Sequence, residues 1–126
     1  MAIDDFQKGL RDLGYNPSVA ASRVTFPYRI EVGKHIGTQI EIGFEVDPNF
    51  PLVPPTGPRI KPRLYPIHPG NDIPHPHGGV HDAQAFGPDW EYWSRPFNGW
   101  ADLPVDQRSV KTYMRFIRDL FAKIDP

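Results

Sequence analysis

The sequence of 126 residues contains no cysteine. A chain without cysteine can form neither a disulfide framework nor a zinc site with cysteine ligands. It also offers no thiol as a catalytic nucleophile, so thioester chemistry is excluded. This absence limits the chemistry that every other motif in the chain can perform.

Three further features are missing from the sequence. The chain has no basic excess, since 14 basic residues stand against 15 acidic ones and the formal net charge is −1. Binding to a phosphate backbone needs such an excess, so we expect no nucleic-acid partner. No apolar run approaches the ~20 residues that span a bilayer, and the acidic N-terminus lacks the pattern of a signal peptide. We therefore expect a cytoplasmic protein with no membrane partner.

Two segments show the periodicity of amphipathic helices within what we expect to be a single domain, residues 1–126. The first covers 3–14, where apolar residues recur every three or four positions and Gly14 is a typical stop signal. The second covers 105–124, with Asp106 as its expected N-cap. These segments predict one helix at each end of the chain.

The middle of the chain has the pattern of antiparallel strands. Apolar residues alternate with others over 24–32 and again over 39–46, and a glycine-containing connection at 33–37 predicts a hairpin between them. Residues 58–61 predict a short third strand. The sequence therefore indicates an α+β fold, in which an antiparallel meander sheet packs against the C-terminal helix, with the N-terminal helix at one side.

Prolines are concentrated in about a quarter of the chain. Ten of the sixteen lie between Asp47 and Pro76. Proline fixes φ and removes a backbone donor, so we expect neither helix nor inner strand there, but a stiff extended segment. The apolar residues that interleave with the prolines are its expected anchors to the core: Phe50, Leu52, Val53, Ile60, Leu64, Tyr65 and Ile67.

Four of the five histidines fall within fourteen residues, at His68, His75, His77 and His81. Alternate residues of an extended segment point the same way, so His75 and His77 are candidate ligands of one metal ion, with His81 or Asp82 to complete the set. The same cluster fits a catalytic or ligand-binding histidine group, and it also fits a solvated loop without a site. The sequence leaves these three interpretations open.

Aromatic residues are dense between 86 and 100. The stretch contains Phe86, Trp90, Tyr92, Trp93, Phe97 and Trp100, together with Arg95. Exposed aromatic residues beside an arginine are typical of binding surfaces, which makes Trp90, Tyr92 and Arg95 candidate binding residues. Large aromatic side chains also hold irregular loops against a core, and Trp93 and Trp100 are the better candidates for that role.

Several short motifs occur in an order similar to that of one protein family. Residues 44–55 (FEVDPNFPLVPP) resemble the strand and proline-rich "YPxxPP" segment of that family. Residues 64–71 (LYPIHPGN) resemble its "HPN" turn, with one glycine inserted before the final residue. Residues 78–81 (GGVH) resemble its "GxxC" stretch, and Trp100 and the helix after it resemble its C-terminal part. In these motifs the chain resembles the ubiquitin-conjugating enzymes, and the resemblance implies their (UBC-like) fold.

The resemblance also assigns roles to two residues. His81 stands where the family has its nucleophilic cysteine, and Asn71 stands where the family's asparagine stabilises the oxyanion of the transferring acyl group. Histidine is a competent nucleophile, but an acyl-imidazole hydrolyses readily and is a poor carrier. For Asn71 the competing interpretation is a turn residue that bonds to its own backbone.

A chain with this resemblance and without cysteine predicts a non-catalytic variant. Bacterial relatives of the family are encoded near ubiquitin-like proteins and activating enzymes, and we expect one of these as the partner. We expect no cofactor on this interpretation. The alternative is a histidine-dependent or metal-dependent enzyme that uses the groove from His68 to His81, with His75, His77 and His81 around a divalent metal.

Overall fold

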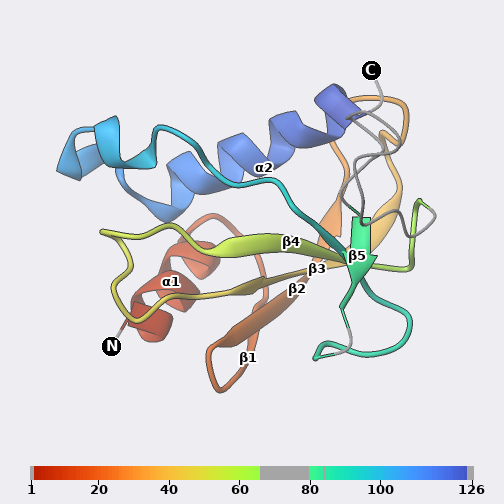
Figure 1. Ribbon diagram of the computed structural model, residues 1–126, viewed down its shortest axis with the longest axis horizontal. Helices are drawn as coiled ribbons and strands as arrows, with labels where there is room; N and C mark the ends of the chain where they lie inside the picture. The colour runs from red at the N-terminus through yellow and green to blue at the C-terminus, as the bar shows by residue number, and fades with distance from the viewer. Residues whose placement is uncertain (1, 66–79, 84, 125–126) are drawn as a thin grey trace.

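An antiparallel sheet and two α-helices, one near each end of the chain, make up the fold (Figure 1). The computed structural model describes residues 2–65, 80–83 and 85–124. Its helices and strands, in chain order, are α1 (Ala2–Asp12), β1 (Ser18–Ala20), β2 (Arg23–Arg29), β3 (Gln39–Glu45), β4 (Thr56–Lys61), β5 (Val80–Asp82), β6 (Glu91–Trp93), the 3-10 turns η1 (Trp100–Asp102) and η2 (Val105–Gln107), and α2 (Val110–Ile124).

The strand order across the sheet is β1-β2-β3-β4-β6-β5. The first four strands pair with their neighbours in chain order, as a meander requires. The order then departs from a meander, because β4 pairs with β6 and β5 lies at the far edge. The predicted α+β class with an antiparallel sheet is confirmed, and the meander prediction holds for β1 to β4.

The helix α1 differs from its predicted bounds by one or two residues at each end, and α2 differs at its start. The helix α1 ends at Asp12, and Gly14 follows with a positive φ of 94°, a conformation that favours glycine. The helix α2 begins at Val110 and not at 105. Asp106 lies in η2, so its prediction as the N-cap is wrong. The cap is Ser109, whose Oγ accepts the backbone N–H of Thr112 at 3.2 Å.

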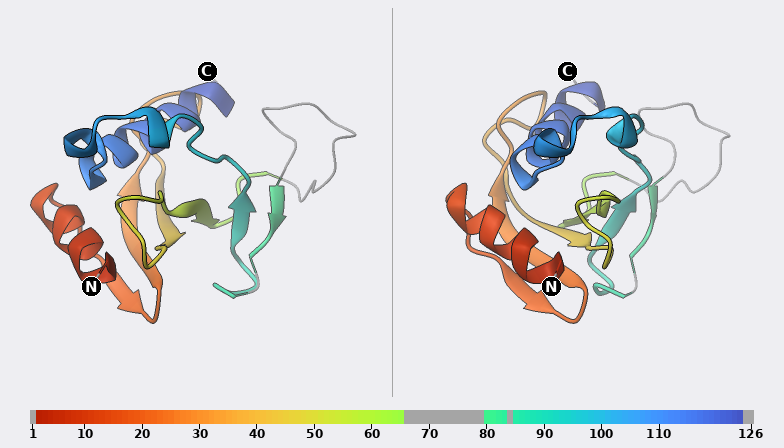
Figure 2. Two further views of the ribbon diagram at one scale, coloured as in Figure 1. Left: turned by 60° about the vertical axis from the view of Figure 1, so that its left-hand side comes forward. Right: turned by 90° about the vertical axis from the view of Figure 1, so that its left-hand side faces the viewer.

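The apolar core lies between the sheet and the two helices (Figure 2). Alternate residues of the central strands supply the sheet side of this core: Val24, Phe26, Tyr28, Ile40, Ile42, Phe44 and Ile60. From α1, the ring of Phe6 meets that of Phe44 edge to face, with centroids 6.0 Å apart. From α2, Phe121 stacks on Tyr28 at 5.8 Å. Each such side chain contributes ~1.5–3 kcal/mol by burial.

The proline-rich segment contains an inner strand, contrary to expectation. Strand β4 lies between β3 and β6 although it includes Pro58. The register between β3 and β4 shifts here, since Gly43 pairs with Arg59 but Glu45 pairs with Thr56. Two residues of β4 therefore lie opposite one residue of β3, and such a bulge accommodates a proline without breaking a regular ladder.

The expected anchors of this segment divide into two groups. Phe50 and Ile60 are buried, and Leu64 and Tyr65 pack against the core, as predicted. Leu52 and Val53 are 65% and 40% exposed, so their predicted anchoring is wrong. Ile67 lies outside the described residues. The segment is held instead by a backbone carbonyl, because Trp100 Nε1 donates a hydrogen bond to the oxygen of Pro51 at 2.8 Å.

A second proline lies inside strand β2. Pro27 pairs with Glu41 of β3 on one side. On the other side, β1 pairs with β2 only as far as Thr25, so Pro27 lies beyond the end of that ladder. Its missing N–H therefore removes no bond between β1 and β2.

Among the described helices, none combines the length and apolar character needed to cross a membrane.

Candidate functional site

The candidate site residues fall into two groups in the structure. Asn71, His75 and His77, together with His68, lie outside the described residues. The other candidates lie among the described residues: His81, Asp82, Trp90, Tyr92 and Arg95.

His81 lies in the middle of β5, opposite Tyr92 of β6. Its side chain is partly exposed, and its ring centroid is 5.7 Å from that of Tyr92 at an interplanar angle of 34°. Within the described part of the chain, neither a carboxylate nor a hydroxyl hydrogen-bonds to the His81 ring. A catalytic histidine generally needs such a partner to fix its tautomer and orientation.

The register places His81 in a row that crosses the whole sheet. Paired residues of neighbouring strands point to the same face. The row runs along the face away from the helices through Ser18, Thr25, Gly43, Arg59, Tyr92 and His81. The chemistry of the candidate site is therefore concentrated on this outer face of the sheet.

Arg59 occupies the centre of that row. Its guanidinium lies 4.5 Å from the ring centroid of Tyr92 and 5.2 Å from that of Phe86. Such cation–π contacts hold the two rings in place. Nη1 also donates to the backbone oxygen and the hydroxyl of Thr56. Burial lowers the pKa of Arg59, although an arginine stays protonated in proteins.

Phe86 reaches the sheet from the connection between β5 and β6. Its ring lies where a side chain at Gly43 would be, since a Cβ there would come within 2.7 Å of the ring. The guanidinium of Arg23, a residue of β2, lies 5.7 Å from the centroid of the Phe86 ring. We call Arg23, Arg59, His81, Phe86 and Tyr92 the outer-face cluster.

Beside the cluster the surface is hollowed by a cavity of about 240 Å³. Its wall includes Arg59, Phe86 and Tyr92, and two carboxylates at Glu45 and Asp82. Aromatic rings, a guanidinium and carboxylates in one hollow provide apolar area and directed hydrogen bonds together. This combination is typical of surfaces that bind another protein.

The other described candidates have mainly structural contacts. Asp82 Oδ1 pairs with Arg63 Nη2 at 3.1 Å, a partly exposed ion pair worth about 0.2–1 kcal/mol. Trp90 is 6% exposed and its ring packs 5.4 Å from that of Phe86, so it has little surface to offer a partner. Trp93 and Trp100 are buried, as predicted. Arg95 donates to the backbone oxygen of Ser94.

A buried carboxylate that no sequence motif indicates lies close to this site. Glu91 is fully buried, and its carboxylate accepts the backbone N–H groups of Leu64 and Tyr65 at 2.9 and 3.3 Å. It also accepts the indole N–H of Trp93 at 3.0 Å. Glu91 thus fixes the end of the segment that follows β4 against β6. One signal was available in the sequence. Residues 91 and 93 are two positions apart, so in a strand Glu91 points to the same face as Trp93.

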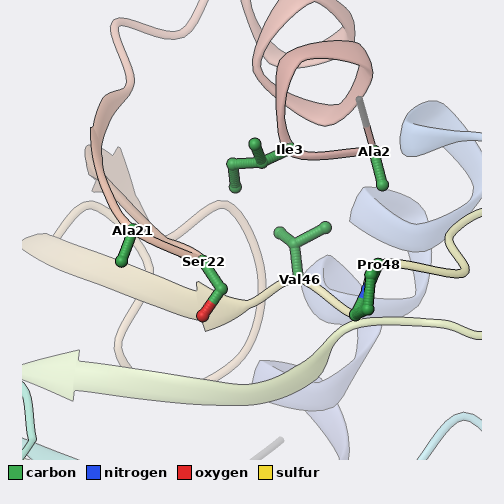
Figure 3. Close-up of a pocket in the computed structure, with 6 residues that line it drawn as sticks. All are labelled: Ala2, Ile3, Ala21, Ser22, Val46 and Pro48. Carbon is green, nitrogen blue, oxygen red and sulfur yellow. The ribbon is translucent and has the colours of Figure 1, made fainter.

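A second hollow, of about 340 Å³, lies between the start of α1 and the turn that joins β1 to β2 (Figure 3). Its lining is mostly apolar, with Ile3, Val46 and Pro48 among its residues. Its hydroxyl group, that of Ser22, donates to Glu45 at 2.8 Å. The hollow therefore offers mainly apolar packing area.

The metal hypothesis requires histidines outside the described residues. Among the residues that the structure does describe, no three metal-ligating side chains come together. On the expectation of no cofactor, tag-free protein supplied with equimolar zinc and then dialysed should retain less than about 0.1 equivalent, as measured by atomic absorption. The variant His75→Ala/His77→Ala should give the same value. Stoichiometric metal that is lost in this variant would instead establish the metal-dependent alternative.

Comparisons of the chain with models of protein families, with curated proteins and with solved structures find no match.

Proposed function

We propose that this protein is a cysteine-free relative of the ubiquitin-conjugating enzymes that binds a ubiquitin-like protein through the outer face of its sheet. An activating enzyme of the same pathway is the second candidate partner. The order of elements supports this proposal, because an N-terminal helix, antiparallel strands with a proline-rich segment between β3 and β4, and a C-terminal helix follow one another along the chain.

The observation that carries the proposal is the setting of His81. On the resemblance, this residue replaces the nucleophilic cysteine. In the structure it is a strand residue whose ring packs on Tyr92, within a cluster held by Arg59. That setting favours a contact surface over acyl transfer, which would need a thiol or an activated nucleophile.

The composition of the outer-face cluster fits protein binding. Tyrosine and arginine are the residue types most enriched among those that dominate interface energies. Here Arg59 fixes the orientation of Tyr92 before a partner arrives, so that little side-chain entropy is lost on binding. The partly exposed imidazole of His81 adds a hydrogen-bonding group beside the ring.

The proposal predicts that His81→Ala/Tyr92→Ala weakens binding of the ubiquitin-like partner by at least about tenfold, since each truncated hot-spot residue costs ~1–2 kcal/mol. Titration of ¹⁵N-labelled protein with that partner measures the affinity, and the amides of β5 and β6 should shift. The activating enzyme is titrated in parallel.

A matched control is the variant Lys8→Ala/Arg11→Ala, on the helix α1 and away from the outer face. It should bind like the unmodified protein. Equal weakening by both double variants, or saturable binding without shifts in β5 and β6, would contradict the assignment of the partner to the outer face. Absence of binding to both candidate partners would contradict the proposed function.

A further inference from the structure

A third hollow lies on the opposite side of the sheet from the outer-face cluster, where the end of α1 meets α2 and β2. Its volume is about 520 Å³, which lies within the range of small-molecule sites. Leu13 and Met114 contribute apolar surface, and Tyr15 and Tyr28 line it together with charged residues of α2.

The charges around this hollow do not balance. Arg118 is satisfied, because Nε pairs with Glu31 at 3.1 Å and Nη1 with Asp119 at 3.4 Å. Lys111 and Arg115 also line the hollow, and neither has an ion pair or hydrogen bond within the described part of the chain. The hollow is therefore lined by three cations and two anions, with the excess positive charge on Lys111 and Arg115.

Helical spacing concentrates this excess. Lys111 and Arg115 are four residues apart on α2, so their side chains extend from the same face of the helix, one turn apart. Two like charges at this spacing repel each other. An anion between them would remove that repulsion and form charge-assisted hydrogen bonds with both.

A buried hydroxyl provides an independent indication of a ligand. Tyr28 is only 2% exposed, yet its hydroxyl has no hydrogen-bond partner among the described residues. Every described side-chain polar atom that is sealed from solvent has a hydrogen-bond partner. Because the Tyr28 hydroxyl has no partner, it is not sealed, and it must open into the hollow that Tyr28 lines. Burial raises its pKa, which keeps the hydroxyl protonated as a donor.

We propose that this hollow binds a small organic anion, with its phosphate or carboxylate group between Lys111 and Arg115 and hydrogen-bonded to Tyr28. The apolar body of the ligand lies against Leu13 and Met114. The site is independent of the proposed function, since it lies on the helix side of the sheet and shares no residue with the outer-face cluster.

Three small probes distinguish the parts of this proposal. Phenyl phosphate and benzoate carry the two anionic groups on the same ring, and benzyl alcohol is a neutral relative. In NMR titrations at low salt, we expect saturable binding of at least one anion with a Kd on the order of 1 mM. The affinity should fall as salt is added, and benzyl alcohol should bind at least about tenfold more weakly.

Variants test the assigned contacts. Lys111→Gln/Arg115→Gln should weaken binding of the preferred anion at least about tenfold, and Tyr28→Phe, which keeps the ring, should weaken it a few-fold. Lys123→Gln is the matched control, because Lys123 is an exposed cation of α2 that does not line the hollow.

Three results would overturn the proposal. They are the absence of saturation for both anions up to about 20 mM, equal affinity for benzyl alcohol, and unchanged anion binding in the folded Lys111→Gln/Arg115→Gln variant. Circular dichroism of every variant establishes that it is folded, and the single variant Arg115→Gln serves if the double variant is not.

Discussion

Glu91→Ala is expected to lower the free energy of unfolding by about 3–5 kcal/mol. The carboxylate is fully buried and accepts three N–H groups, from Leu64, Tyr65 and the Trp93 indole. Removing it leaves these donors without their acceptor, and each unsatisfied buried group costs ~1–3 kcal/mol. Equilibrium denaturation in urea, followed by circular dichroism, measures the change.

The same carboxylate gives stability a pH dependence with a definite sign. Burial raises the pKa of Glu91, and the N–H donors and Arg63 offset this only in part. The folded protein therefore holds this proton more tightly than the unfolded chain. The resulting stabilisation is complete below the unfolded pKa and is lost as the pH rises through the folded pKa.

Glu91→Gln isolates this effect, because glutamine has a similar shape and does not titrate. The stability advantage of the unmodified protein over this variant should be larger at about pH 4.5 than at about pH 7.5. An advantage that grew with pH would mean that Glu91 is stabilised as the anion.

A change below about 0.5 kcal/mol in the free energy of unfolding for Glu91→Ala would mean that its three hydrogen bonds do not support the fold.

Trp100→Ala should cost about 3–5 kcal/mol, because it removes a large buried side chain from the centre of an aromatic group. The ring is 2% exposed and lies 5.1 Å from that of Phe97 and 6.2 Å from that of Tyr113. Its indole N–H also holds the proline-rich segment through Pro51. Loss of Trp100 therefore both opens a cavity and releases that segment.

Two further variants separate these contributions. Trp100→Phe keeps most of the ring and loses the bond to Pro51, so it should cost less than Trp100→Ala by at least about 1 kcal/mol. Val105→Ala changes a nearby side chain that is 70% exposed and should stay within about 0.5 kcal/mol of the unmodified protein. Similar costs for all three variants would show that Trp100 has no special structural role.

The elements that were predicted correctly are long enough for their apolar residues to show a clear period in the sequence. Strands β2 and β3 have seven residues each, and their alternation is clear from the chain alone. Strands β1, β5 and β6 have three residues each, too few to show a period of two. Tertiary pairing defines these short strands, and no local signal specifies it.

The outer-face cluster was only partly predictable for a related reason. His81 and Tyr92 were identified from their residue types and from the motifs around them. Arg59 was not, because its role depends on pairing with Tyr92, which is 33 positions away in the chain (92 − 59). The absence of a side chain at Gly43, which admits the Phe86 ring, likewise acquires its meaning only in the folded sheet.

The proline in β2 has a consequence for how these molecules behave in a crowded solution. Among the residues that the structure describes, β2 has no strand partner on the β1 side beyond Thr25, and that stretch is a potential template for a strand from another copy. Pro27 lies there, exposed, and cannot donate a hydrogen bond to an incoming strand. The residue therefore acts as a gatekeeper that protects an open sheet edge against aggregation.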